Sequence, residues 1–229
     1  MTKTIVVCGY GSGISDAVAR KFGAQGFQVA LVARNRDKLA AAAAALGKAG
    51  ITAKPFPTDL ADAAAVTAMV AKVRAELGPI TVIHYNAYLG GAGDLTSSNV
   101  AELRASFDVA VTGLVVAVQG ALADLKSQPD SAVLVTGGGL AFYDPKVDAM
   151  AVAWNAMGLA VTKAAQHKAV GLLAERLRKE GVYVGEGVVM GAVKGTAFDA
   201  GQATLEASTI ANKFWDLYQG RSEQSIQIS

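Results

Sequence analysis

The fold of this chain is decided by one stretch near its start, Thr4-Ile5-Val6-Val7-Cys8-Gly9-Tyr10-Gly11-Ser12-Gly13-Ile14-Ser15. Residues 4–8 are apolar or β-branched, which predicts a buried strand. Glycines then alternate with other residues, and a helical pattern begins at Ile14. The stretch therefore predicts a strand, a tight turn and a helix that follow one another without a linker.

The same succession of strand and helix continues along the chain. Most predicted strands are apolar throughout instead of alternating, as expected for a sheet with helices on both faces. They comprise residues 4–8, 28–33, 52–56, 81–84, 132–136, 183–189 and 225–228, and helical patterns cover 14–25, 36–49, 61–77, 98–125, 147–179 and 208–219. This alternation predicts an α/β fold with a Rossmann-type, doubly wound, mainly parallel seven-stranded sheet. No linker or repeat interrupts it, so we expect a single domain over residues 1–229.

Composition excludes several classes of protein. With 52% hydrophobic and 17% charged residues, the chain is too apolar for an intrinsically disordered protein. No apolar run reaches the roughly 18 uninterrupted residues of a membrane span. The first residues lack the order of a signal peptide, so we expect a cytoplasmic protein with no membrane partner. The net charge of +2 comes from 21 basic and 19 acidic residues spread along the chain, unlike the basic stripe that binds nucleic acid.

The single cysteine, Cys8, precludes an internal disulfide and a cysteine-based metal cluster, and we expect no metal site. Because its neighbours are apolar, we interpret Cys8 as an inert buried thiol. We therefore expect residues other than Cys8 to perform any chemistry of this chain.

The glycine-rich turn after the first strand has the composition of a dinucleotide site. One glycine serves the tight turn, a second the approach of the backbone to a pyrophosphate, and a third the packing of helix against strand. The helix N-terminus then offers free amides and the positive end of its dipole. A plain glycine-rich turn is the simpler interpretation, but its place between the first strand and the first helix favours a dinucleotide. The residues assigned to this site are Gly9, Gly11, Ser12, Gly13 and Ile14.

The end of the second strand indicates which dinucleotide is bound. A free ribose 2′-hydroxyl is usually bound by an acidic residue at this point, whereas this chain has Arg34-Asn35-Arg36. Guanidinium groups suit a 2′-phosphate, so we expect these residues to select NADP(H). Alternatively, both arginines are solvated residues at the start of a helix.

Together these residues resemble the short-chain dehydrogenase/reductase family, and the resemblance covers nearly the whole chain. The family's glycine motif is similar to residues 8–15, with Ser15 at its third glycine. The resemblance implies a nicotinamide cofactor and further contacts with it at four places. These are Asp59 and Leu60 after the third strand, Asn86 and Ala87 after the fourth, Lys163 in Thr162-Lys163-Ala164-Ala165, and Gly191 and Val193 after the sixth.

The catalytic residues implied by the resemblance are matched only in part. The family has a tyrosine four positions before the lysine, a serine after strand five and an asparagine in the fourth helix. Here these positions hold Leu159, Gly137 of Thr136-Gly137-Gly138-Gly139, and Ala110. Lys163 keeps the family spacing, and we expect it to bind the cofactor ribose; the alternative is an ordinary surface lysine.

Few residues are candidates to replace the missing proton donor. We expect Tyr143 to be the acid, with Thr136 near the place of the family serine; an aromatic lid or a subunit contact would also explain Tyr143. Tyr85 and Tyr88, which flank Asn86, are further polar candidates near the pocket. The others are His84, expected in the core, His167, expected at the surface or an interface, and Asn155, expected to face the cleft from the helix of Lys163.

Three functions remain compatible with the sequence. The first is an NADP(H)-dependent oxidoreductase with a relocated or water-borne acid, because a general acid contributes only about 10²–10⁴-fold in rate. The second is a non-catalytic NADP(H)-binding sensor or partner subunit. The third is a fold that has also lost the nucleotide. No substrate is indicated, and residues 195–202 form only a short segment where the resembled family has its substrate lid.

The two longest helical patterns, 98–125 and 147–179, carry apolar residues around most of their circumference. One face of a sheet cannot cover all of them, so a second buried surface is expected. We therefore predict a homodimer or homotetramer formed through these helices.

Overall fold

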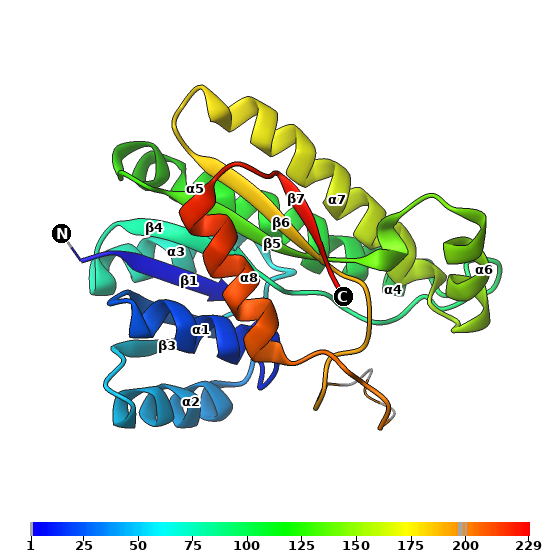
Figure 1. Cartoon of the computed structure of the whole chain (residues 1–229), viewed down its shortest axis with the longest axis horizontal. Helices are drawn as coiled ribbons and strands as arrows, with labels where there is room; N and C mark the ends of the chain where they lie inside the picture. Colours follow the sequence, from blue (N-terminus) through cyan, green and yellow to red (C-terminus); the bar gives the residue numbers. More distant parts are fainter. Residues whose placement is uncertain (1, 197–198, 200) are drawn as a thin grey trace.

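Seven parallel strands form one sheet in the computed structural model, which describes residues 2–196, 199 and 201–229 (Figure 1). The strand order is β3-β2-β1-β4-β5-β6-β7. The strands are β1 (Thr4–Cys8), β2 (Gln28–Ala33), β3 (Ala53–Pro57), β4 (Ile80–Tyr85), β5 (Ala132–Gly138), β6 (Tyr183–Val189) and β7 (Ser225–Ile228). The predicted doubly wound, seven-stranded sheet is confirmed, and the bounds of β1, β2, β6 and β7 are those predicted from the sequence.

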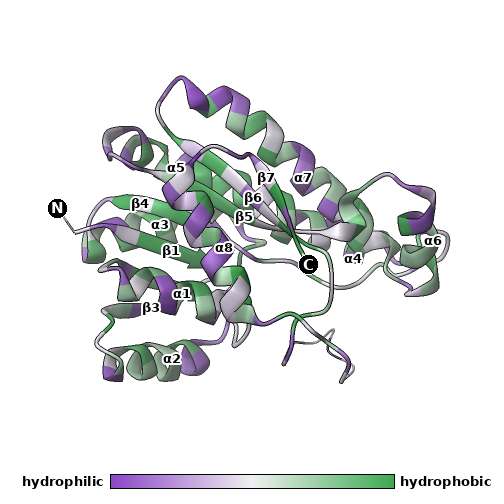
Figure 2. Cartoon of the chain, in the orientation of Figure 1, coloured by the Kyte–Doolittle hydropathy of each residue, from purple (hydrophilic) through white to green (hydrophobic). Residues whose placement is uncertain are grey.

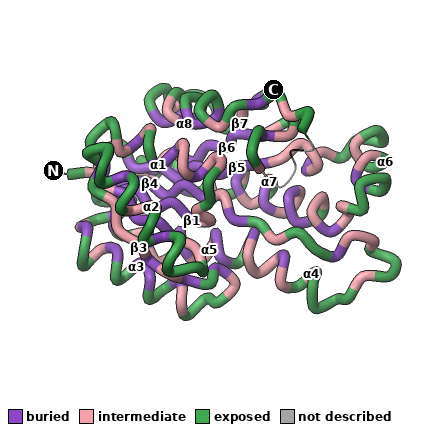
Figure 3. The backbone as a smooth tube through the Cα atoms, turned by 90° about the horizontal axis from the view of Figure 1, so that it is seen from below, coloured by how far each residue is buried: buried purple, intermediate pink, exposed green. Residues whose placement is uncertain are grey.

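Helices cover both faces of this sheet, as the uniformly apolar strands require. They are α1 (Ile14–Ala24), α2 (Arg36–Lys48), α3 (Ala63–Leu77), α4 (Val100–Phe107), α5 (Gly113–Ser127), α6 (Pro145–Ala153), α7 (Met157–Arg178) and α8 (Ala207–Gly220), with a short turn η2 (Gly139–Ala141) after β5. Phe22 and Phe214 are buried under α1 and α8 on one face, and Leu114 and Val170 under α5 and α7 on the other. The inner strands β1, β2, β4, β5 and β6 are largely apolar (Figure 2) and buried (Figure 3), whereas the edge strands β3 and β7 are more exposed.

Four of the helices begin at a side chain that caps them. Asn35, Asp62, Asn99 and Asp144 precede α2, α3, α4 and α6, and each accepts a hydrogen bond from a backbone N–H of the first turn. In contrast, Gly13 precedes α1, and no side chain caps this helix. Its N-terminus is thus left open at the carboxyl end of β1.

The predicted helix 98–125 is two helices joined by a wider turn, which corrects the sequence-based prediction. Between α4 and α5 lies η1 (Asp108–Thr112), one turn of π-helix. The hydroxyl of Tyr85 and the side-chain amide of Gln166 each donate to a carbonyl of this turn. Both donors come from distant parts of the chain, so apolar periodicity alone could not locate the turn.

The predicted helix 147–179 is also wrong, because the structure divides it into α6 and α7. Asn155, between them, has a left-handed backbone with φ of +50°. The first N–H groups of α7 donate to the carbonyls of Ala92 and Gly93, in the loop after β4. Asn155 therefore does not share the helix of Lys163, contrary to the prediction.

One helical stretch in the described part of the chain, Val100–Ser127, is long and apolar enough to cross a membrane. The core helix of a soluble protein has the same length and composition, so this property alone is weak evidence for a membrane span. In the fold, α5 packs on the sheet through buried Leu114, Ala117 and Ala121.

Candidate functional site

The glycine-rich turn lies at the carboxyl end of the sheet, where the strand order reverses between β1 and β4. In doubly wound sheets, ligands bind outside this point. Gly9 has a φ of +81°, and a Cβ there would lie 2.6 Å from the backbone N and Cα of Ala87. Only glycine satisfies both the backbone angle and this close contact. The structure thus places two predicted site residues, Gly9 and Ala87, against each other.

Hydrogen bonds fix the turn to the end of β4. The Ser15 hydroxyl donates to the carbonyl of Gly9 at 2.8 Å and accepts from the Asn86 side-chain amide at 2.8 Å. The backbone N–H of Asn86 donates to the carbonyl of Cys8 at 2.9 Å. Ser15, at the family's third glycine, therefore holds the turn in place. Cys8 below it is fully buried, and burial raises the pKa of its thiol to about 12.

The start of α1 is open above this turn. Gly11 and Ser12 are exposed, and a Cβ at Gly11 would meet nothing within 4 Å. A Cβ at Gly13 would approach the Thr196 methyl to 3.0 Å, while Ile14 packs on the core. Since no side chain caps this 11-residue helix, its first amides and the dipole suit a phosphate group.

Arg34 and Arg36 are exposed beside this edge, at the end of β2 and the start of α2. Among the residues that the structure describes, neither guanidinium has a hydrogen bond or an ion pair. The side chain of Asn35 between them accepts from the N–H of Lys38 at 2.9 Å and caps α2. Both arginines are thus free to bind an anion, whereas the Asn35 oxygen is already used.

The other predicted cofactor residues also follow the strands at this edge. Asp59 is exposed and accepts from the N–H of Ala61 at 3.0 Å, and Leu60 after it is buried. Gly191 is exposed after β6, and Val193 is buried. Within the predicted lid segment 195–202, the residues Ala197, Phe198 and Ala200 lie outside those described, while Asp199 accepts from the N–H groups of Gly195 and Gly201.

Lys163 is not a surface lysine, because its residue is only 8% exposed. Its ammonium donates to the carbonyl of Thr136 at 2.8 Å and to Oε1 of Gln166 at 2.9 Å. Gln166 in turn donates to the carbonyl of Ala110 at 2.8 Å, which links Lys163 to η1. Burial lowers the pKa of Lys163 to about 8, and the charge of Glu186 acts in the opposite direction.

Behind Lys163, His84 and Thr136 form a buried pair. The His84 Nε2 lies 3.2 Å from the Thr136 hydroxyl, and its ring packs edge-on against Phe214. Burial lowers the pKa of His84 to about 3. His84 is therefore the core histidine that the sequence predicted, and the hydroxyl of Thr136 faces it.

The glycines after Thr136 differ in what they face. A Cβ at Gly138 would lie 4.0 Å from the carbons of the Lys163 side chain, whereas a Cβ at Gly137 would overlap Oε1 of Glu186. A serine at 138, but not at 137, would thus lie beside Lys163, so the predicted place of the family's serine at Gly137 is wrong, because Glu186 fills the space there. Leu159, one turn before Lys163 on α7, is half-buried.

Sequence reasoning missed Glu186 and its contact with His167. Glu186 lies in β6, is 1% exposed, and accepts from Nδ1 of His167 at 2.5 Å. The signal was a single acidic residue in the otherwise apolar run Tyr183-Val184-Gly185-Glu186-Gly187-Val188-Val189. His167, expected at the surface or an interface, keeps about a third of its side chain exposed, and this carboxylate, which the sequence did not indicate as its partner, holds the ring.

Tyr143, the expected acid, is 100% exposed in the short segment between η2 and α6. The structure therefore does not enclose it with Lys163, which is buried. The site brings together an open helix N-terminus, two unpaired guanidinium groups, and a buried ammonium at one edge of the sheet. Such an arrangement can bind a phosphorylated ligand and present a proton donor to it.

Comparisons with known proteins agree with this geometry. Residues 3–204 match the family model described as short chain dehydrogenase. The chain belongs to the short-chain dehydrogenase family. Over 112 residues it is 34% identical to the 2,3-dihydro-2,3-dihydroxybenzoate dehydrogenase of Bacillus subtilis, which covers 49% of this chain and 43% of that enzyme. The chain spans about half the length of the first curated relatives it matches, with 53% and 48% for the next two.

Solved members of the family share the whole fold. An NADPH-bound short-chain oxidoreductase of Pseudomonas aeruginosa PAO1, described as containing an atypical catalytic center, has a TM-score of 0.86 at 20% identity, covering 99% of this chain and 95% of that one. A short-chain dehydrogenase of Burkholderia cenocepacia in complex with NADP has a TM-score of 0.84 at 25% identity, covering 99% and 96%. These likenesses extend over the edge that carries the candidate site.

Proposed function

We propose that this short-chain dehydrogenase is an NADP(H)-dependent oxidoreductase whose active site departs from the family pattern. The observation that carries the proposal is the uncapped start of α1 above Gly9, at the point where the strand order reverses. The family resemblance and the NADP-bound relatives support the same cofactor class.

The residues of this edge fit such a cofactor. The first amides of α1 would hold the pyrophosphate, and Arg34 and Arg36 would hold the 2′-phosphate. Lys163, which bonds to two acceptors in the protein, has a third N–H for a ribose hydroxyl. Bound there, the nicotinamide supplies or accepts a hydride.

The proton supply is where this chain departs from its family. Leu159 stands at the place of the family tyrosine and carries no exchangeable proton, and Gly138 and Ala110 stand where a serine and an asparagine are expected. Because an acid contributes about 10²–10⁴-fold, we expect slow reduction of simple carbonyls rather than none. Leu159 equally favours a second candidate, a non-catalytic NADP(H)-binding sensor or partner subunit.

We further propose that the chain works as a homodimer or homotetramer. Large apolar side chains remain exposed on the elements predicted to form the interface, namely Val100 on α4 and Val161 and Leu172 on α7. Burying such side chains against a second copy would remove them from water.

The test combines binding with turnover. NADPH is titrated into the purified chain, and its oxidation is then followed with a panel of aldehydes, ketones and quinones. The proposal predicts saturable NADPH binding and slow oxidation with at least one carbonyl. Binding without turnover on the panel would select the non-catalytic candidate, and absence of binding would contradict both.

A further inference from the structure

Gln166 lies one turn beyond Lys163 on α7 and is only 1% exposed. Its Oε1 accepts from the Lys163 ammonium at 2.9 Å, and its Nε2 donates to the carbonyl of Ala110 at 2.8 Å. A reversed amide would turn its NH₂ group toward the ammonium and its oxygen toward a carbonyl, so these two partners fix its orientation. Both ends of this buried amide are therefore used, and they join α7 to η1.

The η1 end of this link is held by a second side chain. Tyr85, buried in β4, donates its hydroxyl to the carbonyl of Val109, the residue before Ala110. A Cβ at Gly113, where α5 begins, would overlap the Tyr85 hydroxyl, so glycine at that position admits the contact. Two consecutive carbonyls of the π-turn are thus bound by side chains from β4 and α7. The acceptor that Gln166 reaches is therefore itself fixed in place.

The Lys163 ammonium is held from two sides. Besides Gln166, it donates to the carbonyl of Thr136 in β5 at 2.8 Å. The ring of Tyr88, from the loop after β4, lies 5.8 Å from the ammonium, near the outer limit of a cation–π contact. Because an ammonium is tetrahedral and carries three N–H groups, two hydrogen bonds to fixed acceptors also set the direction of the third.

The order of the strands indicates which part of a dinucleotide this third N–H would meet. Arg34 follows β2, the glycine-rich turn follows β1, and Thr136 lies in β5, in the strand order β2-β1-β4-β5. Neighbouring strands are about 4.8 Å apart. With the 2′-phosphate at Arg34 and the pyrophosphate at α1, the second ribose, next to the nicotinamide, would lie toward β5 and Lys163. The adenosine half would lie on the other side of β1.

We propose that Gln166 is a positioning residue that fixes the Lys163 ammonium between β5 and η1, so that its third N–H meets the ribose next to the nicotinamide. This inference rests on the proposed function. Ala110 stands where the family has an asparagine, and its side chain carries no polar atom. Gln166 reaches the same turn from α7, through the backbone carbonyl of Ala110. The chain thus keeps a link between its lysine and this turn although the family's side chain is missing.

The first test compares two ligands that differ in the half that Lys163 would bind. NADPH and adenosine 2′,5′-bisphosphate share the 2′-phosphate, but the bisphosphate ends before the second ribose. In calorimetric titrations, Gln166→Met should bind NADPH about 10-fold more weakly than the wild type, because a charged hydrogen bond loses its direction. Its affinity for the bisphosphate should stay at the wild-type value.

Thr162→Val is the matched control for an effect on the helix alone. Thr162 is buried on α7 beside Lys163, and its hydroxyl bonds with carbonyls of its own helix. We expect this variant to bind both ligands as the wild type does.

Gln166→Asn provides a second variant should Gln166→Met fail to fold. It keeps an amide but is one methylene shorter, so it cannot span from the Lys163 ammonium to the Ala110 carbonyl, and it should weaken NADPH binding in the same way. An equal loss of affinity for both ligands would indicate a general effect on the fold and would overturn the inference. Unchanged affinity for NADPH in a folded variant would overturn it as well.

A double-mutant cycle tests whether Gln166 acts through Lys163. Lys163→Met should itself weaken NADPH binding, and adding Gln166→Met should then cause no further loss. Losses that multiply in the double variant would show that Gln166 acts independently of the lysine, which contradicts the inference. A wild type that binds neither ligand would overturn the proposed function itself, whereas normal binding by the wild type and by all Gln166 variants would overturn this inference alone.

Discussion

His84 shows how a single buried residue couples stability to pH. It lies in β4 with both ring nitrogens removed from water, and its Nδ1 has no partner among the described residues. Burial lowers its pKa to about 3 from an ordinary 6.5. Below pH 6.5 the unfolded chain therefore binds a proton that the folded chain does not, and stability falls as pH decreases through that window.

His84→Gln, which does not titrate, should remove this dependence. Unfolding free energies from urea titrations at pH 6 and pH 5 are the measurement. We expect the wild type to lose about 1 kcal/mol more than the variant between these values, within the limit of 1.36 kcal/mol per pH unit. Parallel changes in the two proteins would show that His84 is protonated in the folded state.

Three glycines, Gly9 after β1 and Gly137 and Gly138 at the end of β5, show which residue roles the sequence predicts and which it does not. Gly9 could be assigned from the sequence, because its role depends on a local turn. The sequence placed the family's serine at Gly137, and the structure corrects this to Gly138, because the two roles depend on what β6 and α7 place beside each glycine. Likewise, Glu186 and His167 lie 19 residues apart and meet only in the folded chain.

The structure therefore indicates which glycine to replace by serine when the family's acid is restored. Leu159→Tyr with Gly138→Ser should raise carbonyl reduction with NADPH about 10²-fold, because a phenol and a hydroxyl then flank Lys163. Leu159→Tyr with Gly137→Ser should instead be destabilised, since the new Cβ overlaps Glu186. A Gly138→Ser double variant that folds and binds NADPH without any gain in rate would contradict this expectation.

At the scale of the element, strands were predicted more accurately than long helices. The buried strands are short and uniformly apolar, so their bounds follow from composition. The two long helical patterns were each divided by contacts from elsewhere: carbonyls of η1 receive donors from β4 and α7, and α7 begins on carbonyls of the loop after β4. These interruptions result from tertiary contacts, so no local sequence pattern predicts them.

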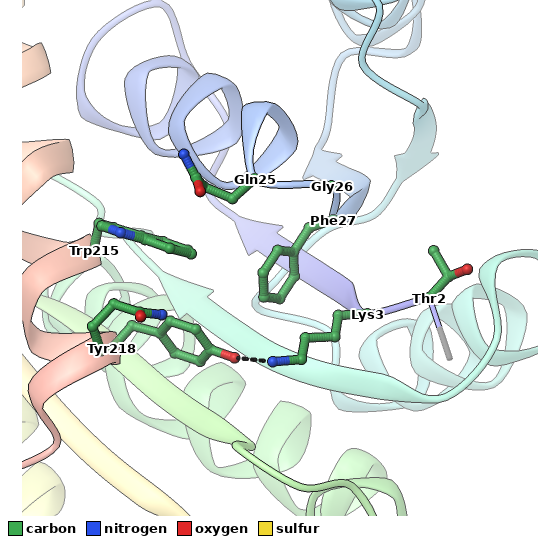
Figure 4. Close-up of a pocket in the computed structure, with 8 residues that line it drawn as sticks. Thr2, Lys3, Gln25, Gly26, Phe27, Trp215 and Tyr218 are labelled. Atoms are coloured by element: carbon green, nitrogen blue, oxygen red, sulfur yellow. Dashed lines mark hydrogen bonds between the residues drawn. The ribbon is translucent and has the colours of Figure 1, made fainter.

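The attachment of α8 rests on aromatic packing. Phe22 and Phe27 lie edge-on to Trp215 of α8, and Tyr218 of the same helix contacts both phenylalanines. Figure 4 shows Phe27, Trp215 and Tyr218 around Lys3, whose ammonium donates to the Tyr218 hydroxyl at 3.1 Å. They border a hollow of about 450 Å³ near the N-terminus.

One position on α8 tests how much this packing contributes. Phe214 is fully buried against His84 and the backbone of Gly187. Phe214→Ala should lower the free energy of unfolding by about 3–5 kcal/mol, because the lost side chain leaves a cavity. The neighbouring exposed Lys213→Ala should change it by less than about 0.5 kcal/mol. Equal midpoints in urea for the two variants would show that α8 is not part of the cooperative core.

At the scale of the whole molecule, the exposed apolar side chains of α4 and α7 predict self-association. Light scattering at low micromolar concentration should give a mass that is two or four times 23.4 kDa. Leu172→Glu, which places a charge in the proposed interface, should lower that mass. A 23.4 kDa particle for the wild type would contradict the expectation.

NADP(H) is expected to bind at this sheet edge. Calorimetric titration of the wild type and of Arg34→Asp with NADPH and with NADH measures this binding. Charged hydrogen bonds contribute about 1.5–3 kcal/mol each, so NADPH should bind about 10- to 100-fold more tightly than NADH, and Arg34→Asp should narrow that ratio. Equal affinities, tighter binding of NADH, or no binding of either would contradict the account.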